Sequence, residues 1–246
     1  MARIFITGSA DGLGQAAARR LVALGHDVVL HGRNRDRAQQ ALRAVPGART
    51  ALEGDLASIE QTRELARQAN EAGPFQAVIH NAGIGVDGPR RETVDGLDDI
   101  FAINALAAFL LTALIQGPGR LIYMTSGLHQ SGNSDMRDLQ WRQRRWNGSQ
   151  AYANSKLFDV VLAFAVARLW PHVLSNAVDP GWAPTKMGGA SAPGDLEQGV
   201  ATQVWLAVSE DPGAKVSGRY FYRKRAQPRS RRGIGRHRPG RVSGRL

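Results

Sequence analysis

The sequence predicts an α/β fold, a single doubly wound parallel sheet of about seven strands with helices on both faces. Short apolar runs of strand length alternate with longer segments of helical periodicity along residues 2–222. A glycine-rich turn joins the first predicted strand to the first predicted helix. The pattern contains no internal repeat and no second hydrophobic core, so we expect one domain at residues 1–222 and a tail at 223–246.

Each predicted element has a local signal, either an apolar run or apolar residues at spacings of three and four. The predicted strands span residues 2–7, 27–31, 48–53, 75–80, 120–126, 172–178 and 217–222. The predicted helices span residues 12–24, 36–44, 58–70, 96–115, 149–170 and 196–208. Ser58 is the expected N-cap of the third helix, and Pro171 ends the long helix at 149–170.

The composition of the 246-residue chain excludes several kinds of protein and site. It has no cysteine, so disulfides and cysteine nucleophiles are excluded, and we predict no metal site. The first strand begins at residue 2, which leaves no room for a secretory signal. The longest apolar run, residues 100–115, is shorter than the ~18–20 residues of a membrane span. We therefore expect a cytoplasmic protein with no membrane span.

Nearly all of the formal net charge of +11 resides in the C-terminal tail. Residues 223–246 carry nine arginines, one lysine and no acidic residue, whereas the rest of the chain carries 22 basic and 21 acidic residues. A charge run this rich in Gly and Pro is predicted to be disordered. Arginine runs bind phosphates, but no aromatic residue after Tyr222 could stack on bases, so we do not expect a nucleic-acid partner.

The glycine-rich turn TGSADGLG, residues 7–14, has the composition of a phosphate-binding loop. Gly8, Gly12 and Gly14 let the backbone turn sharply and approach a pyrophosphate without interfering Cβ atoms. The N-terminus of the following helix offers free N–H groups to the phosphates. The position between a first strand and a first helix favours a Rossmann-type nucleotide site over a tight turn that merely needs glycine.

The end of the second strand, HGRNR at residues 31–35, bears on the choice of cofactor. It lacks the carboxylate that binds a ribose 2′-hydroxyl in NAD sites. Arg33 has the chemistry to stack on adenine and to pair with a 2′-phosphate. NADP(H) is therefore the preferred cofactor. NAD(H) stays open, because Arg33 and Arg35 could instead be solvated residues at the start of the next helix.

Tyr152 and Lys156 are four residues apart on a predicted helix and therefore share one face. A free phenol titrates near ~10, too high for proton transfer at neutral pH, and a neighbouring ammonium favours the phenolate. Such a tyrosine can act as a general acid or base. Ser126, at the end of the preceding strand, can hold a carbonyl or hydroxyl group by a hydrogen bond. A pair at this spacing also arises by chance on a helix surface.

Several motifs in a fixed order favour a catalytic Tyr152/Lys156 pair over a chance pair. With these motifs the chain resembles the short-chain dehydrogenase/reductase family over residues 2 to about 222. The motifs are TGSADGLG, Asp55 in GDLAS, HNAG at 80–83, Asn104 in FAINALAAFLLT, Ser126 in MTSG, the Tyr152/Lys156 pair and PGWAPT at 180–185. Residues 127–148, with QAYANSKLF after them, resemble the branch that contains retinol dehydrogenases.

The resemblance implies roles for individual residues. Ser126, Tyr152 and Lys156 would form the catalytic centre, and Asn104 would complete a proton relay. The implied cofactor-binding residues are Gly8, Gly12, Leu13 and Gly14 at the pyrophosphate, Arg33 at the 2′-phosphate, Asp55 and Leu56 at the adenine, Asn81 and Gly83 at the ribose, Pro180, Gly181 and Thr185 at the nicotinamide, together with Tyr152 and Lys156. Asp11 weakens the NADP preference, because NADP-dependent relatives often have a basic residue there.

We interpret the chain as an NADP(H)-preferring oxidoreductase that transfers a hydride between the nicotinamide and a carbonyl or alcohol substrate, with Tyr152 as general acid/base. A catalytically inactive NADP-binding regulatory or sensor protein is the alternative. Singly, three residues also have plain structural readings: Asn104 as a buried amide, Asp55 as a helix cap and Asn81 as a turn residue. Their order along one chain favours the functional reading.

The predicted surroundings of the site concern the substrate and the assembly. Residues 182–195 are rich in Gly and Pro and are expected to form a lid over the active site. Trp141, Trp146 and Trp182 would give the pocket apolar walls, unless they pack on the surface of a solvated loop. The apolar helices at 96–115 and 149–170 suggest a face for a homodimer.

Overall fold

The structure, a computed structural model, describes residues 1–86 and 88–228 and confirms the predicted α/β class. Its sheet has eight strands in the order β3-β2-β1-β4-β5-β6-β7-β8. The strands are β1 (Arg3–Ile6), β2 (Asp27–Gly32), β3 (Thr50–Glu53), β4 (Ala77–His80), β5 (Arg120–Met124), β6 (Leu174–Asp179), β7 (Arg219–Tyr222) and β8 (Arg225–Ala226). All neighbouring pairs from β3 to β7 are parallel, and β8 is antiparallel to β7.

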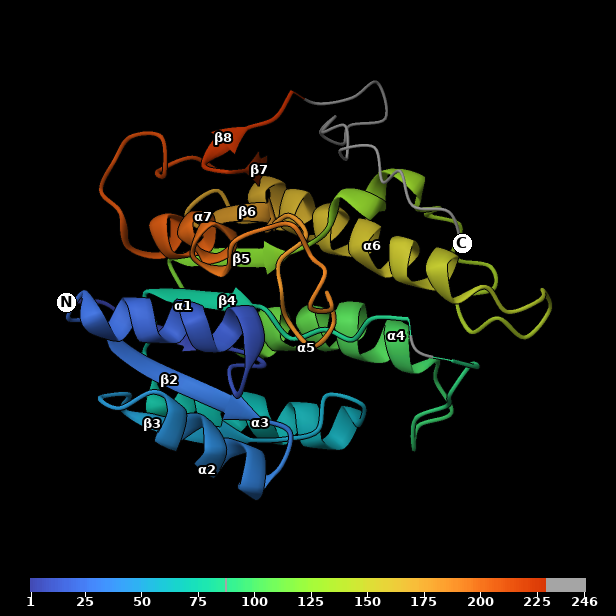
Figure 1. Cartoon of the computed structure of the whole chain (residues 1–246), viewed down its shortest axis with the longest axis horizontal. Helices are drawn as coiled ribbons and strands as arrows, with labels where there is room; N and C mark the ends of the chain where they lie inside the picture. The colour runs from blue at the N-terminus through green and yellow to red at the C-terminus, as the bar shows by residue number, and fades with distance from the viewer. Residues whose placement is uncertain (87, 229–246) are drawn as a thin grey trace.

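Helices cover both faces of the sheet (Figure 1). They are α1 (Gly12–Ala23), α2 (Arg35–Ala44), α3 (Ile59–Ala72), α4 (Asp99–Phe101), α5 (Ala107–Leu114), α6 (Gly148–Leu169) and α7 (Leu196–Val208). Alternate side chains of each strand point to opposite faces, so the two faces have separate cores. One core contains residues of α1, α2 and α7, and the other contains residues of α3, α5 and α6.

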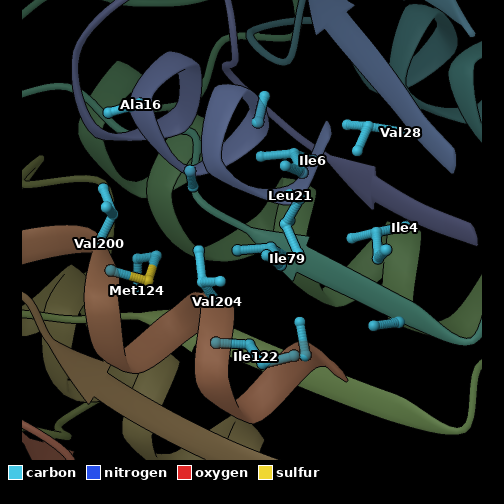
Figure 2. Close-up of a cluster of buried hydrophobic side chains, with 14 of the residues drawn as sticks. Ile4, Ile6, Ala16, Leu21, Val28, Ile79, Ile122, Met124, Val200 and Val204 are labelled. Atoms are coloured by element: carbon cyan, nitrogen blue, oxygen red, sulfur yellow. The ribbon is translucent and has the colours of Figure 1, made fainter. Parts of the chain in front are cut away.

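The core under α1 and α7 is built from branched aliphatic side chains (Figure 2). Leu21 of α1 and Val204 of α7 point toward Ile79 and Ile122 on the central strands. Each fully buried side chain of this size contributes roughly 1.5–3 kcal/mol through the area removed from water. This packing fixes the N-terminus of α1 against the sheet, which is where the glycine-rich turn lies.

The functional edge of the sheet is the one at which the parallel strands end. The arrowheads of β2, β4 and β5 in Figure 1 point to this edge, and the orange segment between β6 and α7 extends across it. The chain moves outward from β1 in both directions, first through β2 and β3 and then through β4 to β7. Doubly wound sheets bind their ligands at such a switch point.

The helix predicted at 96–115 is interrupted. The structure has α4, then a π-helix at Ala102–Leu106, then α5. Asn104 lies in the π-helix, and its side chain binds both backbone groups of Ile84 rather than solvent. Periodicity alone does not reveal this distortion, because the apolar pattern continues through it. A π-turn within a helix is frequent at functional sites.

The sheet continues four residues beyond the predicted domain boundary at 222. Arg223 and Lys224 adopt positive φ angles of 49° and 59° and form a hairpin turn, after which β8 pairs with β7. The remainder of the predicted tail, residues 229–246, lies outside the described residues. Among the residues that are described, no helix has the length and apolar character needed to cross a bilayer.

Candidate active site

Tyr152 and Lys156 lie on the first turns of α6, which begins after its N-cap Asn147. The phenol is partly exposed, whereas the lysine is buried. Lys156 Nζ donates hydrogen bonds to the backbone oxygen of Met124 at 2.9 Å and to Asp159 Oδ2 at 2.9 Å. Burial alone would lower the pKa of Lys156, but the Asp159 carboxylate and Tyr152 raise it above its usual value. The ammonium therefore stays charged at neutral pH.

Ser126 ends the segment after β5 and caps a short 3₁₀ helix at Gly127–Ser131, with its Oγ accepting from Leu128 N at 3.3 Å. His129, which is fully buried, donates from Nδ1 to the backbone oxygen of Ser126 at 2.6 Å. The imidazole also packs on the ring of Tyr220, with 4.8 Å between the ring centroids. His129 therefore holds the backbone of Ser126 in place, and the sequence pattern did not single out this histidine.

Asn104 connects the π-helix to the end of β4. Its Oδ1 accepts from Ile84 N at 2.8 Å, and its Nδ2 donates to Ile84 O at 3.0 Å and to Ser155 Oγ at 3.0 Å. A Cβ at Gly83 would lie 3.3 Å from Asn104 Oδ1 and 3.4 Å from Lys156 Nζ, so both groups border this glycine. The structure thus brings Asn104, Gly83 and Lys156 together.

The glycine-rich turn is held by Asn81. Its Nδ2 donates to the backbone oxygens of Thr7 at 2.9 Å and Gly8 at 3.1 Å. A Cβ on Gly14 would lie only 2.4 Å from Asn81 Nδ2, and one on Gly8 would lie 2.8 Å from Ala82 Cα. These positions tolerate only glycine. In this structure Asn81 fixes the turn, as expected from its structural interpretation. Its role at a ribose stays a prediction.

His31 supports the same turn. Gly8 N donates to His31 Nδ1 at 2.9 Å, so the ring proton is on Nε2, which donates to Gly54 O at 2.8 Å. Burial lowers the pKa of His31 below its usual value, which keeps the imidazole neutral. One imidazole therefore joins the end of β1 to the end of β3.

The N-terminus of α1 has free hydrogen-bond donors. Asp11 is its N-cap residue, yet its side chain accepts no backbone hydrogen bond there. The carboxylate instead pairs with Arg37 at 2.6 Å and with Lys186 at 3.1 Å. Burial would raise the pKa of Asp11, but the hydrogen bonds from Arg37 and Lys186 outweigh it and lower the pKa. The two cations thus neutralise Asp11, the residue whose negative charge weakened the predicted preference for NADP(H).

Arg33 is exposed at the end of β2 and lines a hollow of about 340 Å³ with Asn34, Arg35, Glu53 and Gln61. The hollow contains both cationic and carboxylate side chains. Asp55 lies between β3 and α3, with its Oδ1 accepting from Ala57 N at 2.9 Å, and the next residue, Leu56, is buried. Gln61 Oε1 accepts from the backbone N–H of Asp55 at 3.0 Å. Gln61 therefore connects Asp55 to the hollow that Arg33 lines.

The segment after β6 covers the other side of the site. Pro180 is followed by Gly181, which has a φ of 76° and whose N–H donates to Asp179 Oδ1 at 2.9 Å. Thr185 lies beside the glycine-rich turn, because a Cβ on Gly12 would be 3.5 Å from its Cγ2. Met187 reaches Tyr152, with 4.0 Å between its Sδ and the phenol oxygen. The segment predicted as a lid therefore extends from the turn to the tyrosine.

Comparison with known proteins identifies the family to which the chain belongs. Residues 2–136 match the family model described as short chain dehydrogenase. The chain belongs to the short-chain dehydrogenase/reductase family. Members of this family use NAD(P) and act on CH–OH or C=O groups, so this protein is an oxidoreductase with a small-molecule substrate.

Individual relatives extend over most of this short-chain dehydrogenase. It is 45% identical over 226 residues to an uncharacterized oxidoreductase of Emericella nidulans, covering 90% of this chain and 86% of the relative. It is 30% identical over 250 residues to retinol dehydrogenase 13 of Homo sapiens, covering 89% and 75%. A crystal structure of a blue fluorescent protein from a metagenomic library in complex with NADPH matches at 25% identity, with a TM-score of 0.72 and coverage of 89% and 95%.

Several residues that shape the site were not found from sequence. His31 and His129 hold the glycine-rich turn and Ser126, Arg37 neutralises Asp11, and Asp159 pairs with Lys156. Met187 was read only as part of a flexible lid. The sequence offered one signal for these residues: Asp159 is three positions after Lys156, and residues at this spacing share a helix face. The other contacts join segments far apart in the chain.

We expect the free energy of unfolding of this short-chain dehydrogenase to fall as the pH drops below about 6.5. Burial lowers the pKa of His80 to about 3 and also lowers that of His31. The unfolded chain takes up these protons near pH ~6.5 and the folded chain does not, so each histidine removes up to ~1.4 kcal/mol per pH unit. Asp159 acts in the opposite direction, because burial raises its pKa to about 6.

Chemical denaturation of wild type and of His80→Asn between pH 7 and 5 measures this dependence. The variant should lose less stability over that interval, because one buried histidine with a lowered pKa is absent. His172→Asn is the matched control, since His172 is exposed. If the free energy of unfolding depended on pH equally in wild type and in His80→Asn, His80 would not be a source of the pH dependence.

Proposed function

We propose that this protein is an NADP(H)-preferring oxidoreductase in which Tyr152 is the general acid/base for a carbonyl/alcohol pair. The observation that carries the proposal is a buried, charged lysine one helical turn from a partly exposed phenol. The lysine is held against the backbone of Met124, at the carboxyl end of β5 and two residues before Ser126. The rival, a regulatory or sensor protein that only binds NADP, has no need of this arrangement. Turnover by the wild type therefore decides between them.

The proposed chemistry divides between the bound cofactor and the chain. A bound nicotinamide cofactor would supply or accept the hydride. Tyr152 would donate a proton to the carbonyl oxygen in reduction and remove the hydroxyl proton in oxidation. Lys156 would favour the phenolate through its charge, and Ser126 Oγ would hold the substrate oxygen within reach of the phenol. Asn104, which borders Lys156 across Gly83, would extend the proton path toward solvent.

The chain fits a dinucleotide at the glycine-rich turn. The first turn of α1 has no side-chain cap, and a Cβ at Gly8 or Gly14 would collide with atoms of the neighbouring strand end. Free N–H groups at a helix N-terminus bind phosphate oxygens. In the proposal, Gly8, Gly12, Leu13 and Gly14 hold the pyrophosphate, Asp55 and Leu56 the adenine, Asn81, Gly83, Tyr152 and Lys156 the ribose, and Pro180, Gly181 and Thr185 the nicotinamide.

The proposed preference for NADP(H) depends on Arg33. Its guanidinium is exposed beside the hollow at the end of β2, and Arg37 lies on the first turns of α2. The NADPH complex of the structural neighbour supports this choice. NAD(H) would remain a weaker cofactor, because no carboxylate follows β2 at positions 33–35 to bind a 2′-hydroxyl.

Replacing Arg33 with Ala should raise the Kd for NADPH by about 10–100-fold and leave the Kd for NADH nearly unchanged. The lost interaction is a charge-assisted pair with the 2′-phosphate, which NADH does not have. Fluorescence titration of both cofactors measures the effect. Arg43→Ala, an exposed residue near the end of the following helix α2, is the matched control. A parallel loss of affinity for both cofactors would remove Arg33 from the 2′-phosphate site.

We infer an apolar carbonyl or alcohol as substrate. Tyr152, like Ile84 and Trp146, packs against a buried cluster that contains Trp141, and Met187 lies in front of its hydroxyl. Trp141 and Trp146 contact edge to face with 5.4 Å between centroids, whereas Trp182 is 47% exposed. The substrate would take the place of the Met187 side chain, since a reacting oxygen must come within about 3 Å of the phenol.

The proposed activity is tested with a panel of aliphatic and aromatic ketones, aldehydes and alcohols, assayed with NADPH/NADP⁺ and NADH/NAD⁺. NADPH-dependent reduction of an apolar carbonyl is the expected result. Tight NADPH binding without turnover of any compound would favour the sensor.

We also propose a homodimer through α5 and α6, where Phe109, Leu114 and Val161 are exposed. Light scattering measures the number of subunits.

A further inference from the structure

Asp159 is a buried carboxylate that the proposed reaction does not use. It lies one turn after Lys156 on α6, and the exposed fractions of the two side chains are 3% and 6%. Its Oδ2 is 2.9 Å from Lys156 Nζ. A charge buried to this degree is unfavourable unless it is paired, and Lys156 is the only ion-pair partner of Asp159 among the described residues. The pair therefore exists at a cost that a neutral residue would avoid.

The contacts of the ammonium show what the carboxylate does to it. A lysine ammonium has three N–H donors in a tetrahedral arrangement. Met124 O accepts one and Asp159 accepts another. Two fixed partners set the direction of the third N–H, and Gly83, which also borders Asn104, lies beside the same nitrogen. Without Asp159, one backbone oxygen would remain to hold a long and flexible side chain.

The other titratable groups around Asp159 are neutral. Tyr123 of β5 faces the carboxylate, and burial, together with Asp159, raises the pKa of this phenol. Thr112 of α5 hydrogen-bonds the Tyr123 hydroxyl at 2.8 Å and lies 3.1 Å from His80 Nε2 of β4. Burial keeps the His80 imidazole neutral. On α6 itself Asp159 faces Lys156, so Asp159 is the local counter-charge of the ammonium.

We propose that Asp159 is a positioning residue, which aims the ammonium of Lys156 at the cofactor and tyrosine and keeps it protonated during turnover. This inference rests on the proposed oxidoreductase function and goes beyond the tyrosine, lysine, serine and asparagine set. Asp159 acts only through Lys156 and touches neither substrate nor cofactor.

Removing the carboxylate has two effects of the same sign on carbonyl reduction at alkaline pH. Burial without a counter-charge lowers the pKa of Lys156, so the ammonium is lost at a lower pH. While the ammonium persists, its uncompensated charge favours the phenolate of Tyr152, which has no proton to donate. Both effects move the alkaline limb of kcat toward lower pH. A role in packing alone would lower kcat by the same factor at every pH.

The test compares wild type with Asp159→Asn and Asp159→Glu in NADPH-dependent reduction from pH 5.5 to 9.5. The Asn variant should show its alkaline limb about one pH unit lower, and the Glu variant should keep it near the wild-type position. The ratio of wild-type to Asn-variant kcat should grow above pH about 6, where Asp159 becomes ionised in the wild type. Asp27→Asn removes a paired carboxylate at the opposite edge of the sheet and should leave the limb in place.

A second measurement needs no turnover. The chain has four lysines, at positions 156, 186, 215 and 224, so the side-chain ¹⁵N signals of labelled lysine are few and Lys156→Met assigns the one of interest. The Lys156 signal should titrate at a lower pH in the Asn variant than in wild type. If the Asn variant does not fold, Asp159→Ser takes its place in both measurements.

The outcomes separate the two proposals. A wild type that binds NADPH but reduces no carbonyl overturns the oxidoreductase function, while the lysine titration still reports on Asp159. An unmoved alkaline limb together with an unmoved Lys156 titration in the neutral variants overturns the role of Asp159 and leaves the oxidoreductase function intact.

Discussion

The Tyr152→Phe variant should turn over an accepted carbonyl at least ~10²–10⁴-fold more slowly than wild type, because the loss of a positioned general acid has this order of effect. The substitution removes only the hydroxyl. The ring packing against the cluster of Ile100, Trp141 and Ala151 is retained, so the Kd for NADPH should change little. Steady-state kinetics and cofactor titration on the same preparation measure both quantities.

Tyr123→Phe is the matched control for that variant. Its hydroxyl is buried and hydrogen-bonded to Thr112, and it lies outside the proposed catalytic set. The control should lose about 1 kcal/mol of stability from one buried hydrogen bond and keep most of its turnover. Wild-type turnover by Tyr152→Phe would show that another group moves the proton.

The Gly14→Ala variant should lose measurable NADPH binding and part of its stability. Alanine normally favours a helix over glycine by up to ~1 kcal/mol. At this position the added Cβ would lie 2.4 Å from both Asn81 Nδ2 and Gly8 O, so the contact overrides the propensity. Overpacking of this kind costs about 1–3 kcal/mol. Either the turn or Asn81 must move, and both border the proposed pyrophosphate site.

Thermal unfolding with and without NADPH measures the effect of Gly14→Ala. The variant should unfold at a lower temperature than wild type, and the stabilisation that NADPH gives to wild type should disappear. Gly119→Ala serves as the control, because a Cβ there meets only Gln76 O at 3.4 Å, at the opposite edge of the sheet. A Gly14→Ala variant that NADPH stabilises as well as it stabilises wild type would place the pyrophosphate elsewhere.

The predicted fold class is confirmed, and the structure differs from the predicted elements where contacts beyond the local sequence pattern intervene. The third helix begins after the expected cap Ser58, whose Oγ accepts from Gln61 N. The predicted helix at 96–115 is interrupted because Asn104 binds the backbone of Ile84, a residue twenty positions earlier. The last strand was missed because β8 contains two residues and depends on its pairing with β7.

The sequence by itself determined what depends on neighbouring residues. Strand and helix periodicity, the glycines of the phosphate turn and the spacing of Tyr152 and Lys156 all act over a few positions, so their physical consequences can be derived from the letters. The tertiary structure alone decided which charges meet. Asp11 is neutralised by Arg37 and Lys186, and Lys156 is held against Met124, because the fold brings distant segments within hydrogen-bonding distance and excludes water from them.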